Sequence, residues 1–137
     1  MDIDEICYKV IGAAMAVHRH FGPGYLEEVY KNALIVELTA LGNHTEKEVP
    51  IAVNYKGIRV GDYRADVIVD NRLILELKAV TNINPSHEAQ VVNYLNATGI
   101  EDGLLINFGA HSLQHKHKYR VYRQPQALNP VNPVNPV

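Results

Sequence analysis

The sequence has little cysteine, little excess charge and no long apolar segment, and each shortage argues against a class of protein. Cys7 is the only cysteine, so no disulfide can form within the chain, which suits a reducing compartment. No apolar run approaches the roughly 18 residues that indicate a membrane span. The formal net charge is -2, so no global basic field indicates nucleic-acid binding, and any such surface must be local.

The composition is that of a soluble globular domain. Hydrophobic residues make up 47% of the 137 positions and charged residues 20%, which fits one domain with a substantial core. The N-terminus, Met-Asp-Ile-Asp-Glu, is acidic and unlike a secretory signal. The default expectation is therefore a cytoplasmic protein that has no membrane partner.

Helical spacing of apolar residues predicts two helices at the start of the chain. The first contains Ile3 to Val17, begins with a capping box formed by Asp2 and Glu5, and ends at Gly22. The second runs from about Leu26 to Leu41, with Leu26 among its inward-facing residues.

The spacing then changes to the period of two that is typical of strands. Strands are expected over 49–55, where Pro50 suggests an edge or a bulge, and then over 67–69 and 73–77. A third helix should start at Asn84 and end near Gly99. An Asp102-Gly103 turn and two further strands, 104–108 and 114–122, should follow. The order ααβββαββ indicates an α/β or α+β sheet with helices packed on it.

The last residues differ in character from the rest. Asn-Pro-Val occurs three times between Asn129 and Val137, and proline at every third position is incompatible with a regular helix or ladder. The chain is therefore expected to comprise a folded domain, 1–123, and a disordered or extended tail, 124–137. A docking peptide is the alternative reading of the tail.

Three ionisable residues interrupt the two central strands. Glu76 and Lys78 point to the same face because they are two residues apart. A three-residue turn centred on Asn71 would place Asp66 directly opposite Glu76, with Cβ atoms about 4.5–5.5 Å apart. Two opposed carboxylates need a cation between them, and a divalent metal is the obvious candidate. The alternative is a structural ion-pair cluster.

An ordered set of motifs extends this pattern over residues 5–123. They are Gly24-Tyr-Leu-Glu27-Glu-Val-Tyr30, Tyr63-Arg-Ala-Asp66, Leu75-Glu-Leu-Lys-Ala-Val80, Gln90-Val-Val-Asn-Tyr94 and Gly103-Leu-Leu-Ile-Asn-Phe-Gly109. The set resembles the PD-(D/E)XK nuclease superfamily and, within it, the GxxExxY protein family. The resemblance implies a central mixed sheet of about five strands flanked by helices.

The resemblance also implies metal-dependent hydrolysis of phosphodiester bonds in nucleic acid, with DNA favoured. Asp66, Glu76 and the backbone carbonyl of Leu77 would bind Mg²⁺ or Mn²⁺, for which hard oxygen ligands are suited. Glu27 would reach the metal directly or through water. Lys78 would orient or help to deprotonate the attacking water. Glu27 has an alternative reading as a solvated helix residue.

Two further groups are candidates for substrate contact. Gln90 and Tyr94 share one helical face and resemble an element beside the metal site in the phage-exonuclease-like branch, where Gln90 would act in catalysis. Lys116, Lys118 and Arg120 alternate along the last strand and form a basic stripe. Such a stripe suits phosphate contacts, and it equally protects an edge strand from aggregation.

Two rival functions stay open beside the nuclease. The first is a non-catalytic module that keeps the fold and binds nucleic acid or protein, and the second is a hydrolase of small phosphorylated molecules. The intact set Asp66, Glu76 and Lys78 favours catalysis over the first rival. Action as a homodimer or beside a partner protein is compatible with a chain of this size.

Overall fold

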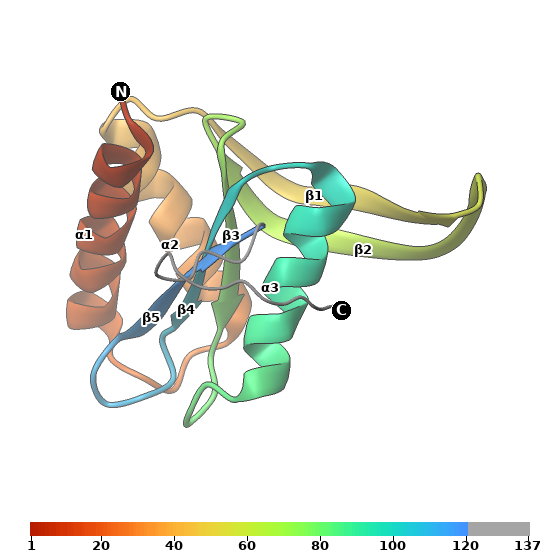
Figure 1. Ribbon diagram of the computed structural model, residues 1–137. Helices are drawn as coiled ribbons and strands as arrows, with labels where there is room; N and C mark the ends of the chain where they lie inside the picture. The colour runs from red at the N-terminus through yellow and green to blue at the C-terminus, as the bar shows by residue number, and fades with distance from the viewer. Residues whose placement is uncertain (121–137) are drawn as a thin grey trace, which may run out of the picture.

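The computed structural model describes residues 1–120 and has three helices and five strands in that range (Figure 1). The predicted tail, 124–137, and the last two residues of the final predicted strand lie outside the described residues. The elements are α1 (Ile3–Phe21), α2 (Glu27–Ala40), β1 (Thr45–Tyr55), β2 (Ile58–Val69), β3 (Leu73–Lys78), α3 (Pro85–Thr98), β4 (Asp102–Asn107) and β5 (Gln114–Tyr119). The predicted order ααβββαββ is confirmed.

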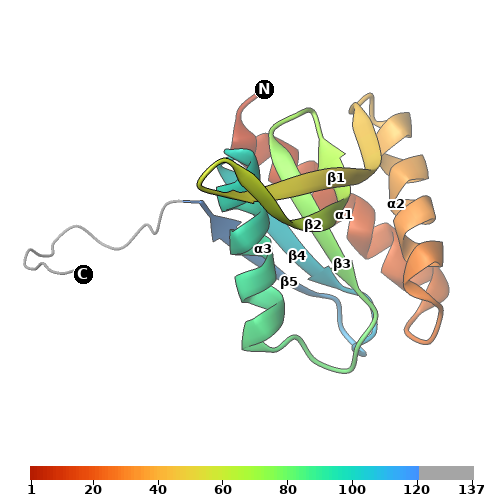
Figure 2. The ribbon, with the colours of Figure 1, turned by 90° about the vertical axis from the view of Figure 1, so that its right-hand side faces the viewer.

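The five strands form one mixed sheet in the order β1-β2-β3-β4-β5. Strands β3 and β4 are parallel, and α3 is the crossover that connects them; the other neighbours are antiparallel. Helices α1 and α2 cover one face of the sheet and α3 covers the other (Figure 2). This is the α+β architecture expected from the sequence.

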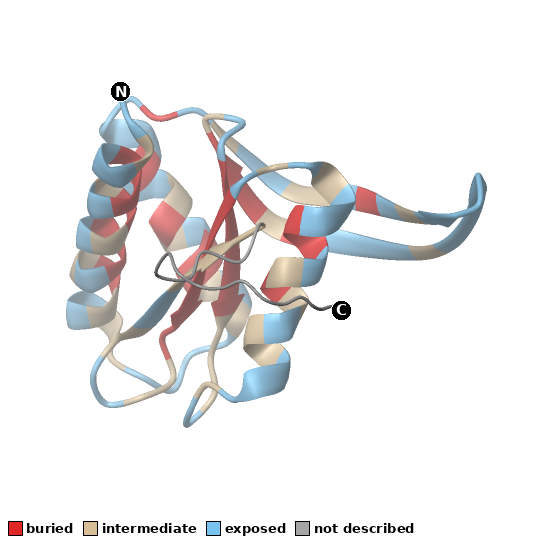
Figure 3. Ribbon diagram, in the orientation of Figure 1, coloured by how far each residue is buried: buried red, intermediate tan, exposed pale blue. Residues whose placement is uncertain are grey.

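The sheet separates two hydrophobic clusters, and β3 contributes to both (Figure 3). Leu73, Leu75 and Leu77 pack toward α1 and α2, whereas Ile74 packs toward α3. By the same alternation Glu76 and Lys78 lie on the α3 face. A strand buried on both faces normally carries only apolar residues, so these two charges are the candidates for a functional site.

Most local signals act as the sequence predicts. The capping box of Asp2 and Glu5 begins α1, Asn84 caps α3, and Gly99, with φ of 79°, ends α3. Strand β1 is an edge strand that contains Pro50, although the register shift falls at Val53 and Asn54.

Two local predictions are wrong. Leu26 is the N-cap of α2 and is 79% exposed, because the inward stripe begins only with the next turn of the helix. Asp102 and Gly103 belong to β4 and do not form a turn. The Asp102 carboxylate faces His117 of β5 at 2.9 Å, and Gly103 lies beneath α3, so tertiary contacts fix both residues in the strand.

Asn107, at the end of β4, is fully buried and was not singled out from the sequence. Its amide accepts from the Val80 N–H at 2.9 Å and donates to the Val80 carbonyl at 2.8 Å. The side chain thereby fixes the chain just after β3, where Lys78 ends the strand.

No helix within residues 1–120 is long and apolar enough to cross a membrane.

Candidate active site

The β2–β3 hairpin brings Asp66 and Glu76 together. Asp70 and Asn71 adopt positive φ in the turn, and the ladder pairs Val69 with Leu73 and then continues to Val67 and Leu75. The ladder ends one residue short of the predicted Asp66–Glu76 pair, and the two carboxylates lie close enough for Asp66 to act on the pKa of Glu76. Beyond Leu75, a side chain of β2 accepts a hydrogen bond from the backbone of β3: the Leu77 N–H donates to Asp66 Oδ2 at 2.8 Å.

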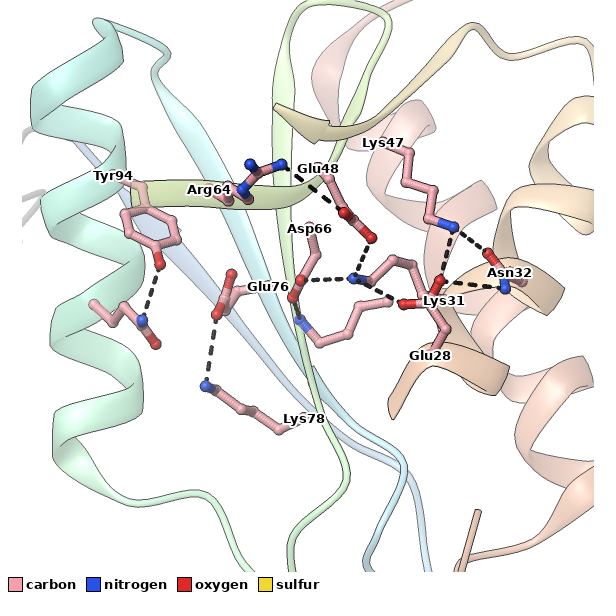
Figure 4. A network of polar contacts seen from close by, with 12 residues as sticks. Glu28, Lys31, Asn32, Lys47, Glu48, Arg64, Asp66, Glu76, Lys78 and Tyr94 are labelled. Atoms are coloured by element: carbon pink, nitrogen blue, oxygen red, sulfur yellow. Dashed lines mark hydrogen bonds and ion pairs between the residues drawn. The ribbon is translucent and has the colours of Figure 1, made fainter. Parts of the chain in front are cut away.

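Glu76 is buried, with 5% of its surface exposed, and is incompletely paired. Its Oε2 lies 3.5 Å from Lys78 Nζ, while Oε1 has no hydrogen-bond partner among the described residues (Figure 4). Burial, followed by the charge of Asp66, raises the pKa of Glu76 from 4.5 to about 8. Burial and the negative charge of Asp66 both favour the protonated form of Glu76, in the direction expected for two neighbouring carboxylates.

A buried cation beside the acidic pair, Lys31 of α2, was not predicted from the sequence. Lys31 is 7% exposed, and its Nζ lies 3.3 Å from Asp66 Oδ1 and 3.5 Å from carboxylate oxygens of both Glu28 and Glu48 (Figure 4). Its sequence position could have indicated its burial, because it follows Tyr30 and lies three residues before Leu34, on the inward-facing stripe of the helix.

Glu48 reaches Lys31 through an unusual backbone conformation. Its φ is 53°, in the left-handed region, and the β1–β2 ladder pairs Lys47 with Val67 and Val49 with Ala65 but omits the intervening pair. A non-glycine residue in this region is uncommon and indicates local strain. Asp66 thus lies between Glu48 on one neighbouring strand and Glu76 on the other.

The segment from Gly24 to Tyr30 positions Glu27 at the start of α2. Tyr30 is fully buried, stacks on Phe108 with centroids 4.7 Å apart, and donates its hydroxyl to the Gly22 carbonyl. Burial and the charge of Asp66 raise the pKa of Glu27, while Lys78 lowers it, so its carboxylate lies within electrostatic reach of the pair. The Glu27 side chain has no hydrogen bond or ion pair among residues 1–120.

Helix α3 presents Gln90 and Tyr94 to the same region. Gln90 Nε2 donates to the Tyr94 hydroxyl at 2.9 Å, as their spacing on one helical face allows. Burial, followed by the charge of Glu76, raises the pKa of Tyr94 to about 12. Both residues therefore stand beside the acidic pair, where the sequence places them.

The basic stripe of β5 is largely paired with acidic residues. Lys118 lies 3.0 Å from Glu88 of α3, and Arg120 lies 2.7 Å from Glu101. Lys116 is exposed and makes no ion pair within the described part of the chain. One of the three basic groups is therefore available without breaking an existing pair.

The sequence matches a known protein family over nearly all of the described residues. Residues 4–121 match the sequence profile of the PD-(D/E)XK nuclease superfamily. The chain belongs to this superfamily. Its members are generally nucleases and other phosphodiesterases, and they typically use divalent metals such as Mg²⁺.

One solved structure has a similar fold. The crystal structure of SSO0001 is similar with a TM-score of 0.54 and 20% sequence identity. The similarity covers 67% of this chain and 48% of SSO0001, so it spans about half of that chain and bears on the fold alone. No curated protein matches the sequence.

The donor set of this PD-(D/E)XK chain fits a hard divalent cation. The candidate ligands are oxygens, and Glu76 Oε1 is buried without a partner. The Leu77 N–H faces Asp66, and its carbonyl lies on the same edge because a strand residue directs both groups to one neighbour. Among residues 1–120, no three carboxylate, His or Cys side chains converge closely enough to hold a metal by themselves. The fit therefore depends on the backbone oxygen and water as further ligands.

Proposed function

We propose that this chain is a metal-dependent nuclease of the GxxExxY type that hydrolyses phosphodiester bonds of nucleic acid, with DNA favoured. The observation that carries the proposal is Glu76, a buried carboxylate opposed to Asp66, with one oxygen unpartnered and Lys78 beside the other. Burying a carboxylate with one oxygen unpartnered is unfavourable. Its retention in a strand core is best explained by a ligand that it binds.

Asp66, Glu76 and the Leu77 carbonyl would hold Mg²⁺ or Mn²⁺, with Glu27 as a ligand directly or through water. When bound, the metal polarises the phosphate and lowers the pKa of a coordinated water. Lys78 Nζ lies 3.5 Å from Glu76 Oε2, where it would orient the attacking water and stabilise the negative charge that develops on the phosphate.

The side of the site formed by α3 would contact the substrate. The Tyr94 hydroxyl accepts a hydrogen bond from Gln90 and keeps its own proton, since the pKa of Tyr94 is raised to about 12. It can therefore donate to a phosphate oxygen, as can the Gln90 amide. Lys116 would provide a further phosphate contact, and Lys118 and Arg120 would do so after leaving their acidic partners.

One observation favours the non-catalytic rival. Lys31 Nζ already lies 3.3 Å from Asp66 Oδ1. In a protein that has lost catalysis, Lys31 would therefore balance the charge of Asp66 without a metal. The two functions differ in their prediction for Mn²⁺. A nuclease site gains stability when the metal binds the folded state, whereas a site neutralised only by Lys31 does not.

Cleavage assays test the activity. Purified protein should cut nucleic acid with Mg²⁺ or Mn²⁺ and stop in EDTA, and Glu76→Ala and Lys78→Ala should fold but lose activity. Linear, circular, single-stranded and RNA substrates distinguish endonuclease from exonuclease and DNA from RNA. Equal cleavage by wild type and both variants would indicate a contaminating nuclease and would refute the assignment.

Thermal melts test the metal independently of activity. Mn²⁺ should raise the melting temperature of the wild type and do little for Glu76→Gln, which keeps the shape of the side chain but removes its charge. An absence of any shift up to millimolar Mn²⁺ in either protein would favour the non-catalytic module.

A further inference from the structure

The outer half of the β1–β2 hairpin is an arm, residues 53–64, that projects beyond the sheet past α3 (Figure 1). Four of its large side chains are substantially exposed: Tyr55 63%, Ile58 67%, Val60 60% and Tyr63 43%. Exposed aromatic and aliphatic side chains gathered on one projecting element indicate a surface that contacts a partner.

The charge of the arm indicates the chemistry of that partner. It carries Lys56, Arg59 and Arg64 against one acidic residue, Asp62, in a chain whose net charge is -2. Asp62 pairs with Arg59, and Arg64 lies 4.0 Å from Glu48, so Lys56 is the basic group of the arm that makes no ion pair within residues 1–120. Lys56 lies over the ring of Tyr55, 5.4 Å from its centroid. Basic groups interleaved with aromatic rings are typical of surfaces that follow a nucleic-acid strand.

A groove lies between the arm and α3, with a volume of about 340 Å³. It is lined by Val53, Asn54, Tyr63, Asn93, Asn96 and Ala97. None of these side chains is charged, and the three asparagine amides make no hydrogen bond within residues 1–120. Amides that both donate and accept, beside an aromatic ring, suit the edge and face of a nucleobase and do not suit a phosphate.

The groove is continuous with the acidic pair. The ring of Tyr63 contacts the ring of Tyr94, with centroids 5.2 Å apart. Tyr94 in turn accepts a hydrogen bond from Gln90, and the charge of Glu76 contributes to its raised pKa. A nucleotide whose phosphate lies at Asp66 and Glu76 would therefore have a neighbouring base within reach of the groove.

We propose that this groove binds an unpaired nucleobase next to the scissile phosphate, and that the arm holds the strand leading to it. The proposal rests on the nuclease function and specifies its substrate as a nucleic acid with at least one unpaired nucleotide at the cleavage position. A base stacked within a duplex cannot present both its face to Tyr63 and its edge to Asn93 and Asn96.

Binding of labelled oligonucleotides tests the groove. Fluorescence anisotropy is measured in a Lys78→Ala background, so that the probe stays intact, with a single-stranded oligonucleotide and a series that lacks one base at a time. One abasic position should weaken binding on the order of tenfold, the loss expected for one stacked base. A fully paired duplex should bind less tightly than the single strand.

Variants of the groove should remove that base dependence. With Tyr63→Ala, or with Asn93→Ala combined with Asn96→Ala, the sensitive abasic position should cause no further loss. Tyr63→Phe should retain the penalty because the ring is kept. Tyr8→Ala is the matched control, since Tyr8 is 81% exposed on α1, across the sheet from α3.

The outcomes separate the two proposals. If the wild type neither cleaves nor binds any nucleic acid, the nuclease function fails and the groove assignment falls with it. If the wild type cleaves and binds, but the abasic penalty is absent or is unchanged in both groove variants, the groove assignment alone is refuted.

Discussion

At the residue scale, Glu76 and Asp66 occupy similar places on adjacent strands but have different surroundings. Both Asp66 oxygens have partners, from Lys31 and from the Leu77 N–H. Glu76 has one weak contact to Lys78 and an unpartnered oxygen. Replacing Glu76 by Gln therefore removes one charge of the pair and no ion pair except that with Lys78, whereas neutralising Asp66 would also remove the shortest ion pair of the buried Lys31.

The raised pKa of Glu76 predicts how stability depends on pH in the metal-free protein. Between pH 4.5 and 8 the folded protein binds more protons at this group than the unfolded chain does. The stabilisation from protonated Glu76 is complete below the unfolded pKa and is lost as the pH rises through the folded pKa. Melting temperatures in EDTA should therefore fall over this range, and Glu76→Gln should show a flatter profile. Identical profiles for the two proteins would contradict the shift.

Replacing Lys31 should destabilise the fold strongly. Lys31→Met leaves the partly buried Asp66 without its cation, and loss of one partner from a buried ion pair costs about 3–5 kcal/mol. Urea denaturation of the metal-free protein measures the change in unfolding free energy. Lys47→Met is the matched control because Lys47 is more exposed and pairs with Glu28 at the surface, a contact worth about 1 kcal/mol or less. Equal losses for the two variants would show that Lys31 is not buried as described.

The sequence predicted the acidic pair but not Lys31, for a physical reason. Strand period and a short turn fix which residues oppose each other across a hairpin, so Asp66 and Glu76 follow from local signals. The partners of a helix residue depend on how the helix packs on the sheet. The pairing of Lys31 with Glu48 is set by tertiary packing, and no local sequence pattern predicts it.

At the element scale, β4 shows how packing overrides turn chemistry. Asp-Gly is a strong turn signal, yet Asp102 and Gly103 are strand residues whose neighbours are His117 and α3. A Cβ on Gly103 would lie 2.7 Å from Val91 Cγ1 and 3.4 Å from the Ile74 carbonyl oxygen. The glycine is thus required by the close approach of α3 to the sheet.

Gly103→Ala should therefore displace α3 and destabilise the protein by roughly 1–3 kcal/mol, the usual cost of overpacking a core. Because α3 carries Gln90 and Tyr94, cleavage should also decrease. Gly61→Ala is the control within the same sheet, since its Cβ would make an ordinary 3.8 Å contact with Val53, and its stability should be unchanged or slightly raised. Chemical denaturation of both variants provides the comparison. A fully stable Gly103→Ala would mean that α3 packs less closely than the structure shows.

At the scale of the whole molecule, the element order and the layers were predictable, whereas the shape of the substrate surface was not. The order ααβββαββ follows from periodicity, and α3 is the kind of crossover that a parallel β3–β4 pair requires. The length of the β1–β2 arm depends on how far two edge strands pair beyond the core. The alternation in Val49 to Tyr55 predicted a strand there without indicating that its outer half projects from the domain.

The sequence predicts a folded domain of 1–123 and a tail of 124–137 that is dispensable for folding. The superfamily match ends at residue 121, and from its sequence the repeated Asn-Pro-Val beyond Leu128 is expected to add neither a ladder nor a packed helix. A chain that ends at Gln124 should keep the melting temperature and the Mn²⁺ response of the full chain. Its urea m-value should also be unchanged, because m scales with the surface exposed on unfolding. A smaller m-value with a lower melting temperature would show that the tail packs on the domain, as the docking-peptide reading requires.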